Sequence, residues 1–390
     1  MDLGFTEQQE QFRQQLRDFL DREMSPALKD ELANRSDQGP GPESKAFLKT
    51  LARAGFLGIG WPKKYGGGGF PVINQYIFYE EMGKRGVYTG GLTISSVGPT
   101  IANVGTDEQK QEFLPRILRG EMEFGIGYTE PGAGTDLASM QLRAVVDGDD
   151  FVINGQKIFT SAAHFATHIW LAARTDPDAP KHKGISLIIV PIDTPGITVR
   201  PLWTVGDGRT NEVFYEDVRV PRKNLVGEMN RGWYYVATAL DFERVSGGRY
   251  GGLATRMQEL IKFAQDTIVD GKPLSQEPMV RARLAQLTMD VEMVRLLDYR
   301  AAWIIESGRV PNYEASAVKT FAAELSQRMA DESLDMMGLY GQLRPGSKHA
   351  PLGGKEERAY RASYPGRFAA GTSEIQRNII AQRGLGLPRG

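Results

Sequence analysis

The N-terminal third of the chain carries its hydrophobic residues at helical spacing. Phe12, Leu16, Phe19 and Leu20 follow the i, i+4, i+7, i+8 pattern, which places them on one face of an amphipathic helix. Two later segments, SKAFLKTLARAG and DEQKQEFLPRILRG, are also helical in pattern and end in Gly, a common helix stop. We therefore expect helices up to about Gly125.

The pattern changes between Phe124 and about Gly227. Short runs of β-branched and aromatic residues are separated here by Asp-Gly, Asn-Gly and Pro turns, as in strands and hairpins. The runs are LRAVVDGDDFVINGQKIFTS, HIWLAARTD, ISLIIVPID and NEVFYEDVRVP. They predict a β domain in the middle of the chain.

Helical spacing returns after Arg231. The segments MVRARLAQLTMDVEMVRLLDYRAAWIIESG and EASAVKTFAAELSQRMADESLDMMG are long helical patterns, joined by a short loop at Gly308 to Pro311. Such a pair is typical of antiparallel bundle helices. The sequence therefore predicts a mostly helical α+β protein with domains at residues 1–123, 124–229 and 230–390.

Composition narrows the class of protein. The 390 residues are 41% hydrophobic and 24% charged with a net charge of −1, so no basic excess exists to neutralise nucleic-acid phosphates. The chain has no cysteine, which excludes disulfides, thiolate catalysis and cysteine-ligated metals. Its charged N-terminal segment does not resemble a signal peptide, and no run reaches the ~18 apolar residues of a membrane span. We expect a soluble, cytoplasmic protein.

Several familiar chemistries have little support. His164 and His168 are four residues apart but lie in a turn-and-strand pattern, whereas a metalloprotease site needs a helix there. The Gly-rich segment WPKKYGGGGF lacks the strand and the Lys-Ser/Thr context of a phosphate loop. No G-x-S-x-G nucleophile motif is present. We expect no metal site and no nucleophilic hydrolase.

The segment YTEPGAGTD, Tyr128 to Asp136, is a better candidate. A Thr, an acid, a Pro and two Gly form a tight loop at the opening of the β region. Such a loop can aim backbone N–H groups and hydroxyls at a ligand. Taken alone, an ordinary structural turn explains it equally well.

Glu243 is a second candidate. If its segment is a helix, the carboxylate shares an apolar face with Val236, Ala239 and Leu240, where burial would raise its pKa toward the range of a general base. Gly247 and Gly251 then leave space beside it on the following turns. The alternative is a structural ion pair with Arg244 or with a neighbouring helix.

Together these motifs resemble the flavin-dependent acyl-CoA dehydrogenase family. GWPKKYGGGG, YTEPGAGTD, INGQKIFTS, NEVFYEDVRVP and GTSEIQRNIIAQR occur in the family's order over nearly the whole chain. The resemblance implies an N-terminal helical domain, a middle β-barrel domain and a C-terminal four-helix bundle. It also implies an FAD cofactor between the β domain and the bundle.

The resemblance assigns roles to individual residues. Cofactor-binding positions are Tyr128, Thr129, Thr135, Phe159, Ser161, Thr372 and Glu374. Substrate-binding positions are Thr135, Asp241, Arg244, Ala370 and Gly371. Phe159 takes the place of an aromatic residue beside the flavin ring, and Glu374 stands where a Gln is common.

The implied reaction is α,β-dehydrogenation of an acyl-CoA thioester. Many members place the base directly before Gly-Thr, where this chain has Ala370, which cannot accept a proton. Others place it on the first helix of the C-terminal domain, directly before an Arg, and here that position is Glu243, followed by Arg244. The resemblance therefore implies that Glu243 takes the α proton while the β hydride passes to flavin N5. Electrons would then pass to an electron-transferring flavoprotein.

The chain departs from the family at the cofactor clamp that one subunit lends to its neighbour. Thr267, Asp270, Asp335 and Leu339 stand where an Arg, a Phe, a Gln and a Gly are usual. This pattern resembles the active subunit of heteromeric sterol-side-chain acyl-CoA dehydrogenases, and it implies a hetero-oligomer with a second acyl-CoA dehydrogenase-like chain. A homo-oligomer is the other expected assembly. Two alternatives remain: a flavin oxidase or monooxygenase of the same fold, and a non-catalytic sister subunit.

Overall fold

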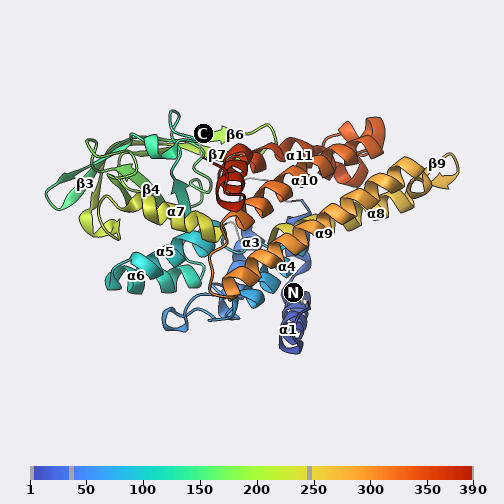
Figure 1. Ribbon diagram of the computed structural model, residues 1–390, viewed down its shortest axis with the longest axis horizontal. Helices are drawn as coiled ribbons and strands as arrows, with labels where there is room; N and C mark the ends of the chain where they lie inside the picture. Colours follow the sequence, from blue (N-terminus) through green and yellow to red (C-terminus); the bar gives the residue numbers. More distant parts are fainter. Residues whose placement is uncertain (1–3, 35–38, 244–247, 389–390) are drawn as a thin grey trace.

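The computed structural model describes residues 4–34, 39–243 and 248–388; within the helices that flank the second gap, the side chains at 238, 240–243 and 248 are outside this description. The chain forms an N-terminal group of helices, a middle sheet and a long C-terminal helical bundle (Figure 1). The order predicted from the sequence, helical then β then helical, is confirmed.

Six α-helices form the N-terminal part of the described chain. They are α1 (Glu7–Glu23), α2 (Pro26–Ala33), α3 (Pro42–Arg53), α4 (Val72–Lys84), α5 (Gly98–Val104) and α6 (Asp107–Leu118). A π-helical turn at Thr93–Val97 leads into α5. Thr6 and Thr106 close capping boxes at the starts of α1 and α6, with Gln at the third helical position of each.

The middle part is a mixed sheet. Its strands are β1 (Phe124–Gly127), β2 (Arg143–Asp147), β3 (Asp150–Lys157), β4 (His168–Arg174), β5 (Ile185–Pro191), β6 (Ile197–Trp203), β7 (Arg209–Pro221) and β8 (Leu225–Val226). They are ordered β6-β7-β3-β2-β4-β5-β8, and β1 runs parallel to β4. The predicted hairpin is present as β2 and β3, which pair antiparallel from Arg143 opposite Asn154 to Asp147 opposite Asp150.

The C-terminal part is a helical bundle. Its elements are α7 (Gly232–Glu243), α8 (Gly248–Asp266), the hairpin β9 (Ile268–Val269) and β10 (Lys272–Pro273), α9 (Pro278–Glu306), α10 (Tyr313–Met337), α11 (Lys355–Ala362) and α12 (Ser373–Ile379). The two long helices predicted from the sequence are α9 and α10, packed side by side. Figure 1 shows the β9–β10 hairpin at the far tip of the bundle.

Short turns of other helix types connect these elements. The 3-10 turns are Lys63–Tyr65, Leu137–Ser139, Arg222–Asn224, Leu274–Gln276, Gly338–Gln342, Pro351–Gly354 and Tyr364–Arg367, and a second π turn covers Ile380–Gly384. No helix in the described part of the chain is long and apolar enough to cross a membrane.

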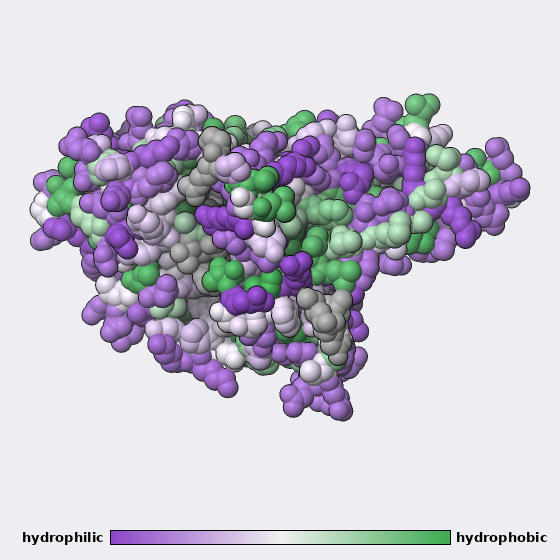
Figure 2. Space-filling model, in the orientation of Figure 1, coloured by the Kyte–Doolittle hydropathy of each residue, from purple (hydrophilic) through white to green (hydrophobic). Residues whose placement is uncertain are grey.

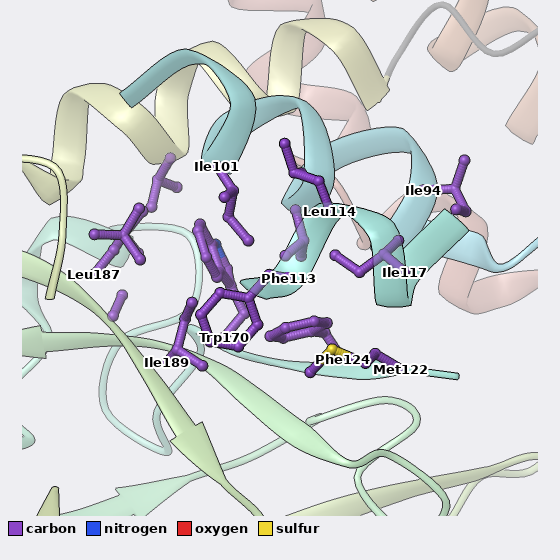
Figure 3. Close-up of a cluster of buried hydrophobic side chains, with 14 of the residues drawn as sticks. Ile94, Ile101, Phe113, Leu114, Ile117, Met122, Phe124, Trp170, Leu187 and Ile189 are labelled. Carbon is purple, nitrogen blue, oxygen red and sulfur yellow. The ribbon is translucent and has the colours of Figure 1, made fainter. Parts of the chain in front are cut away.

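One hydrophobic core joins the N-terminal helices to the sheet. Figure 3 shows Phe113, Leu114 and Ile117 of α6 facing Phe124 of β1 and Trp170 of β4. Trp170 is fully buried at this junction. Because the core spans both parts, β1 and the loop that follows it are held against a rigid base.

Candidate functional site

The loop that carries Tyr128 begins directly after β1. The Tyr128 hydroxyl accepts a hydrogen bond from Trp170 Nε1 at 2.9 Å, and its carbonyl accepts one from Lys157 Nζ at 3.0 Å. Both ends of this residue are thus tied to the sheet. Further along the same loop Thr135 is exposed.

A second segment lies beside this loop. The Ile158 backbone N–H donates to the Thr129 carbonyl at 2.9 Å, so the turn after β3 runs next to the turn after β1. This bond brings the predicted residues Thr129, Phe159 and Ser161 into one region. We call residues 128–142 and 158–163 the β-domain half of the site.

Phe159 has an unusual conformation in this half. Its φ is +56° and its side chain is 55% exposed, although bulky residues rarely adopt the left-handed region. Buried Asn211 fixes the turn: its carbonyl accepts the Thr160 N–H at 2.9 Å, and its side-chain amide donates to the Thr160 carbonyl at 3.0 Å. Backbone strain of this kind is concentrated at functional sites.

The C-terminal half of the site consists of residues 367–376. Ala370 and Gly371 have φ values of +54° and +89°, and Thr372 caps α12 by accepting the Ile375 N–H at 3.3 Å. The Gln376 side-chain amide donates to the Ala370 carbonyl at 3.0 Å, and Lys319 Nζ donates to the Gly371 carbonyl at 2.7 Å. Thr372 is therefore the N-cap of α12.

Contacts of α11 hold the bundle against the sheet. Arg361 donates to the Val205 carbonyl at 2.5 Å and pairs with Asp207 at 2.7 Å, both in the β6–β7 loop. The carboxylates of Glu357 and Asp207 beside this guanidinium raise the pKa of Arg361. A Cβ on Gly206 would lie 2.7 Å from the Ala362 Cα, so the two surfaces meet at backbone distance.

A surface cavity of about 470 Å³ opens beside the C-terminal half. It is lined by Glu324, Gln327, Arg328, Asp331, Tyr360, Tyr364, Arg367 and Arg377. Two of its arginines already face a carboxylate, since Glu324 lies 2.6 Å from Arg377 and 3.7 Å from Arg367. Its lining combines positive, negative and aromatic groups.

The predicted base lies at the end of α7, which packs against the π turn at Thr93–Val97 and against β5. Val236 and Ala239 are buried, as the predicted apolar face requires. The side chains of Asp241 and Glu243, and all of Arg244, lie outside the described residues, so their placement stays a prediction.

Gly251 corrects one expectation from the sequence. It does not provide open space, because a Cβ there would lie 2.3 Å from the Glu80 carbonyl oxygen and 2.7 Å from Lys84 N. The glycine permits the close packing of α8 on α4 instead. Gly247 lies outside the described residues.

The histidines of the β domain have protein partners. His164 Nδ1 lies 3.0 Å from the Asn211 amide and His168 Nδ1 lies 2.9 Å from Thr167 Oγ1. Burial lowers the pKa of His168 to about 4. Within the described ranges, no group of three or more His, Cys, Asp or Glu could hold a metal ion.

Lys157 and Asn211 were not predicted from the sequence. For Lys157 a signal existed, because it shares the inward phase of β3 with the buried Phe151 and Ile153. A charged residue on the buried face of a strand requires a partner. No comparable pattern singles out Asn211, whose partners come from a distant turn.

Comparison with known proteins shows which protein family the chain matches. Three family models match: Acyl-CoA dehydrogenase, N-terminal domain, over residues 6–121; Acyl-CoA dehydrogenase, middle domain, over residues 125–218; and Acyl-CoA dehydrogenase, C-terminal domain, over residues 230–385. The acyl-CoA dehydrogenase FadE26 of Mycobacterium tuberculosis (strain ATCC 25618 / H37Rv) is 40% identical over 398 residues, covering 100% of this chain and 99% of that protein.

Two solved structures are similar over their full length. The Tcur3481-Tcur3483 steroid ACAD superposes with a TM-score of 0.92 at 40% identity, covering 100% of both chains. The ChsE4-ChsE5 complex from Mycobacterium tuberculosis superposes with a TM-score of 0.90, again at 40% identity and 100% coverage of both chains.

Proposed function

The chain belongs to the acyl-CoA dehydrogenase family of oxidoreductases, and from that premise we propose that it uses FAD to remove the α and β hydrogens of an acyl-CoA thioester. The observation that carries the proposal is the convergence of two turns. The Thr129–Ile158 hydrogen bond sets the loop after β1 beside an exposed, left-handed Phe159. We also propose the domain boundaries at 123/124 and 229/230.

The residues of both halves suit a flavin. An exposed aromatic ring at Phe159 offers a face for a planar ring system. Ser161, two residues further along the chain, and Thr135, in the loop after β1, are also exposed. Among the described residues, Thr160 Oγ1, Ser373 Oγ and Gln376 Oε1 are buried without a hydrogen-bond partner. Unpaired buried oxygens are uncommon, and a bound polar ligand is one explanation.

The proposed contacts follow the positions given by the family resemblance. Tyr128, Thr129, Thr135, Phe159, Ser161, Thr372 and Glu374 would hold FAD. Thr135, Asp241, Arg244, Ala370 and Gly371 would hold the acyl-CoA. When bound, the flavin supplies the acceptor for the β hydrogen together with its bonding electron pair.

The chain supplies the base. Glu243 would take the α proton, and the electron pair of that C–H bond forms the α,β double bond as the β hydride leaves. Ala370 would contribute only its backbone N–H, as a donor to the thioester oxygen where negative charge develops. The two electrons would pass on to an electron-transferring flavoprotein.

We further propose a hetero-oligomer with a second acyl-CoA dehydrogenase-like chain. The segment Thr267–Asp270, which contains β9 and begins the turn to β10, has no Arg or Lys. The other position, Asp335, is a carboxylate that pairs with Arg283 at 3.2 Å. Leu339 is 84% exposed. Both similar structures named above carry two protein names, which is the support for a two-chain assembly.

Exposed apolar side chains offer surface for such a partner. On the bundle they include Ile268, Val269, Met279, Met289, Met293, Leu339 and Tyr340. Figure 2 shows apolar side chains gathered over the centre and the bundle side of one face. Because one similar structure is described as a steroid ACAD, an acyl-CoA with a polycyclic group is the first substrate to try.

Flavin content and sedimentation test the proposal together. The chain is expressed alone and together with each acyl-CoA dehydrogenase-like protein encoded by a neighbouring gene. FAD per chain is measured from absorbance and protein mass, and sedimentation gives the size of each assembly. We expect little flavin alone and about half an FAD per chain in a two-chain complex. Full flavination of a homo-oligomer would refute the hetero-oligomer.

A second measurement tests the chemistry. Under anaerobic conditions an acyl-CoA should bleach the bound flavin and yield an α,β-unsaturated thioester without O₂ consumption. Bleaching only by a non-thioester substrate, or product formation only with O₂, would point instead to an oxidase or monooxygenase.

A further inference from the structure

A buried lysine lies under the β-domain half. Lys157 is completely buried, and its ammonium group meets three acceptors from the neighbouring loop. Nζ lies 3.0 Å from the Tyr128 carbonyl, 2.8 Å from Glu130 Oε1 and 3.8 Å from Met140 Sδ. All three N–H groups therefore point to residues 128–140.

Glu130 extends this anchor to the far end of the loop. Its Oε1 accepts the Leu142 N–H at 2.9 Å and its Oε2 accepts the Gln141 N–H at 2.7 Å. Its own backbone pairs in both directions with Ala133, at 3.0 and 3.2 Å. One carboxylate thus joins Lys157, the start of the loop and the strand that follows it.

Arg174 supports the same loop from β4. Its guanidinium donates to the Ala138 carbonyl at 2.6 Å and to the Met140 carbonyl at 3.3 Å, and also to the Lys181 and Lys183 carbonyls. The side chain is largely buried. The loop between Tyr128 and Leu142 is therefore fixed by three buried charged groups.

We propose that Lys157 is a positioning residue for the flavin, which holds the backbone at Tyr128 to Glu130 in its ligand-binding shape. This inference rests on the proposed function. Thr129 lies between two residues bonded to Lys157, and its own carbonyl accepts the Ile158 N–H, so all three residues are tied to the end of β3. Displacing Lys157 frees the segment that carries Thr129, one of the proposed cofactor contacts.

The charge of Lys157 gives the anchor a pH dependence. Burial lowers the pKa of Lys157 to about 8; Glu130 opposes this shift and Arg174 adds to it. As pH rises through about 8 the ammonium loses its proton, and the attraction to Glu130 is lost. A flavin affinity that depends on this contact should weaken above that pH.

Lys157→Met tests the role, because it keeps an unbranched side chain of nearly the same length and removes the charge. Lys181→Met is the matched control, since Lys181 also contacts this loop but through an exposed pair with Asp136 at 2.9 Å. Hydrogen exchange of a peptide spanning residues 128–142 reports the anchor without a cofactor. FAD affinity is measured with whichever form, the chain alone or the two-chain complex, holds flavin.

The expected result has three parts. K157M should speed exchange at Gln141 and Leu142, weaken FAD binding at least tenfold at pH 7, and abolish the decline in affinity between pH 7 and 9. K181M should match the unmodified protein in all three. If K157M does not fold, E130Q/K157M replaces it, because that variant removes the charge of both partners in the buried Lys157–Glu130 pair, and the same loss is expected.

Two failures are distinguishable. Absence of FAD binding by the unmodified protein in every assembly would sink the proposed function and the positioning role together. Bound FAD with equal affinity and the same pH profile in K157M would overturn the positioning role alone.

Discussion

The two halves of the proposed flavin site are built differently. The β-domain half rests on Glu130, Lys157 and Arg174, which are buried charges with defined partners. The C-terminal half has two left-handed residues, Ala370 and Gly371. The Ala370 carbonyl accepts from Gln376, and the Gly371 carbonyl accepts from Lys319 and, at 3.5 Å, from Gln376. Each half contains buried oxygens without a partner: Thr160 Oγ1 in the first, and Ser373 Oγ and Gln376 Oε1 in the second. The first half is thus held by a network of buried charges, whereas the backbone of the second half is held by fewer hydrogen bonds.

The largest expected effect concerns neither half but the proposed base, Glu243. Glu243→Gln should lower turnover about 10²- to 10⁴-fold, because the amide cannot accept the α proton, while FAD stays bound. Acyl-CoA turnover and flavin content are measured on the same preparation. Glu112→Gln, an exposed site on α6, is the control. Unchanged turnover in E243Q would remove Glu243 from the mechanism.

The two halves can be compared directly by removing one amide from each. Asn211→Ala leaves the Thr160 carbonyl without its side-chain donor and should weaken FAD binding about tenfold, from an unsatisfied buried group worth ~1–3 kcal/mol. Gln376→Leu removes the bond to the Ala370 carbonyl and a longer one, at 3.5 Å, to the Gly371 carbonyl, and should weaken FAD binding less, because Lys319 still holds Gly371. Asn154→Ala, which breaks an exposed bond to Asp217 in the same sheet, is the control. A larger loss in Q376L would reverse the comparison.

The order of helical and β parts could be predicted from the sequence because the spacing of hydrophobic residues differs clearly between them. The hairpin of β2 and β3 was marked by an Asp-Gly turn, and α9 and α10 by long helical runs bounded by Gly and Pro. β1 has only four residues and its parallel pairing with β4 brings together distant residues, so pattern alone could not define it.

The site was harder to predict because its supports are not local. Lys319 reaches Gly371 across 52 positions and Asn211 reaches Thr160 across 51. No periodicity encodes such contacts. Gly251 shows the opposite error: the sequence suggested that this glycine leaves open space beside a candidate base, yet the backbone of α4 occupies that space.

A titratable carboxyl, that of Glu123, lies directly before β1, the strand that leads into the β-domain half. Burial raises the pKa of Glu123, directly before β1, to about 7, against hydrogen bonds from Tyr88 and Thr93 that lower it. The unfolded carboxyl titrates near its ordinary 4.5, so the folded state binds more protons between pH 4.5 and 7. Stability contributed by this group is therefore present at low pH and falls as pH rises toward 7.

Glu123→Gln should remove this pH dependence. The free energy of unfolding of E123Q minus that of the unmodified protein should be about 1–3 kcal/mol larger at pH 8 than at pH 5. Denaturant titration of both proteins at the two pH values measures this difference. Glu121→Gln, whose carboxylate forms an exposed pair with Arg119, is the control and should show no such gain. A constant difference for E123Q at both pH values would contradict the raised pKa.

The smallest expected effect tests the C-terminal half through its backbone. Ala370 has a φ of +54°, a region that costs most residues about 1–2 kcal/mol and costs Gly very little. Ala370→Gly should therefore change the free energy of unfolding by no more than about 1 kcal/mol, because the strain that it relieves is offset by the greater entropy of Gly in the unfolded chain. Ala370→Val, which adds a β-branched side chain in the same region, should destabilise by more than A370G. Denaturant titration of both variants decides the matter: equal stabilities would mean that the backbone strain at 370 is absorbed by the residues around it, and that the C-terminal half is as rigid as the β-domain half.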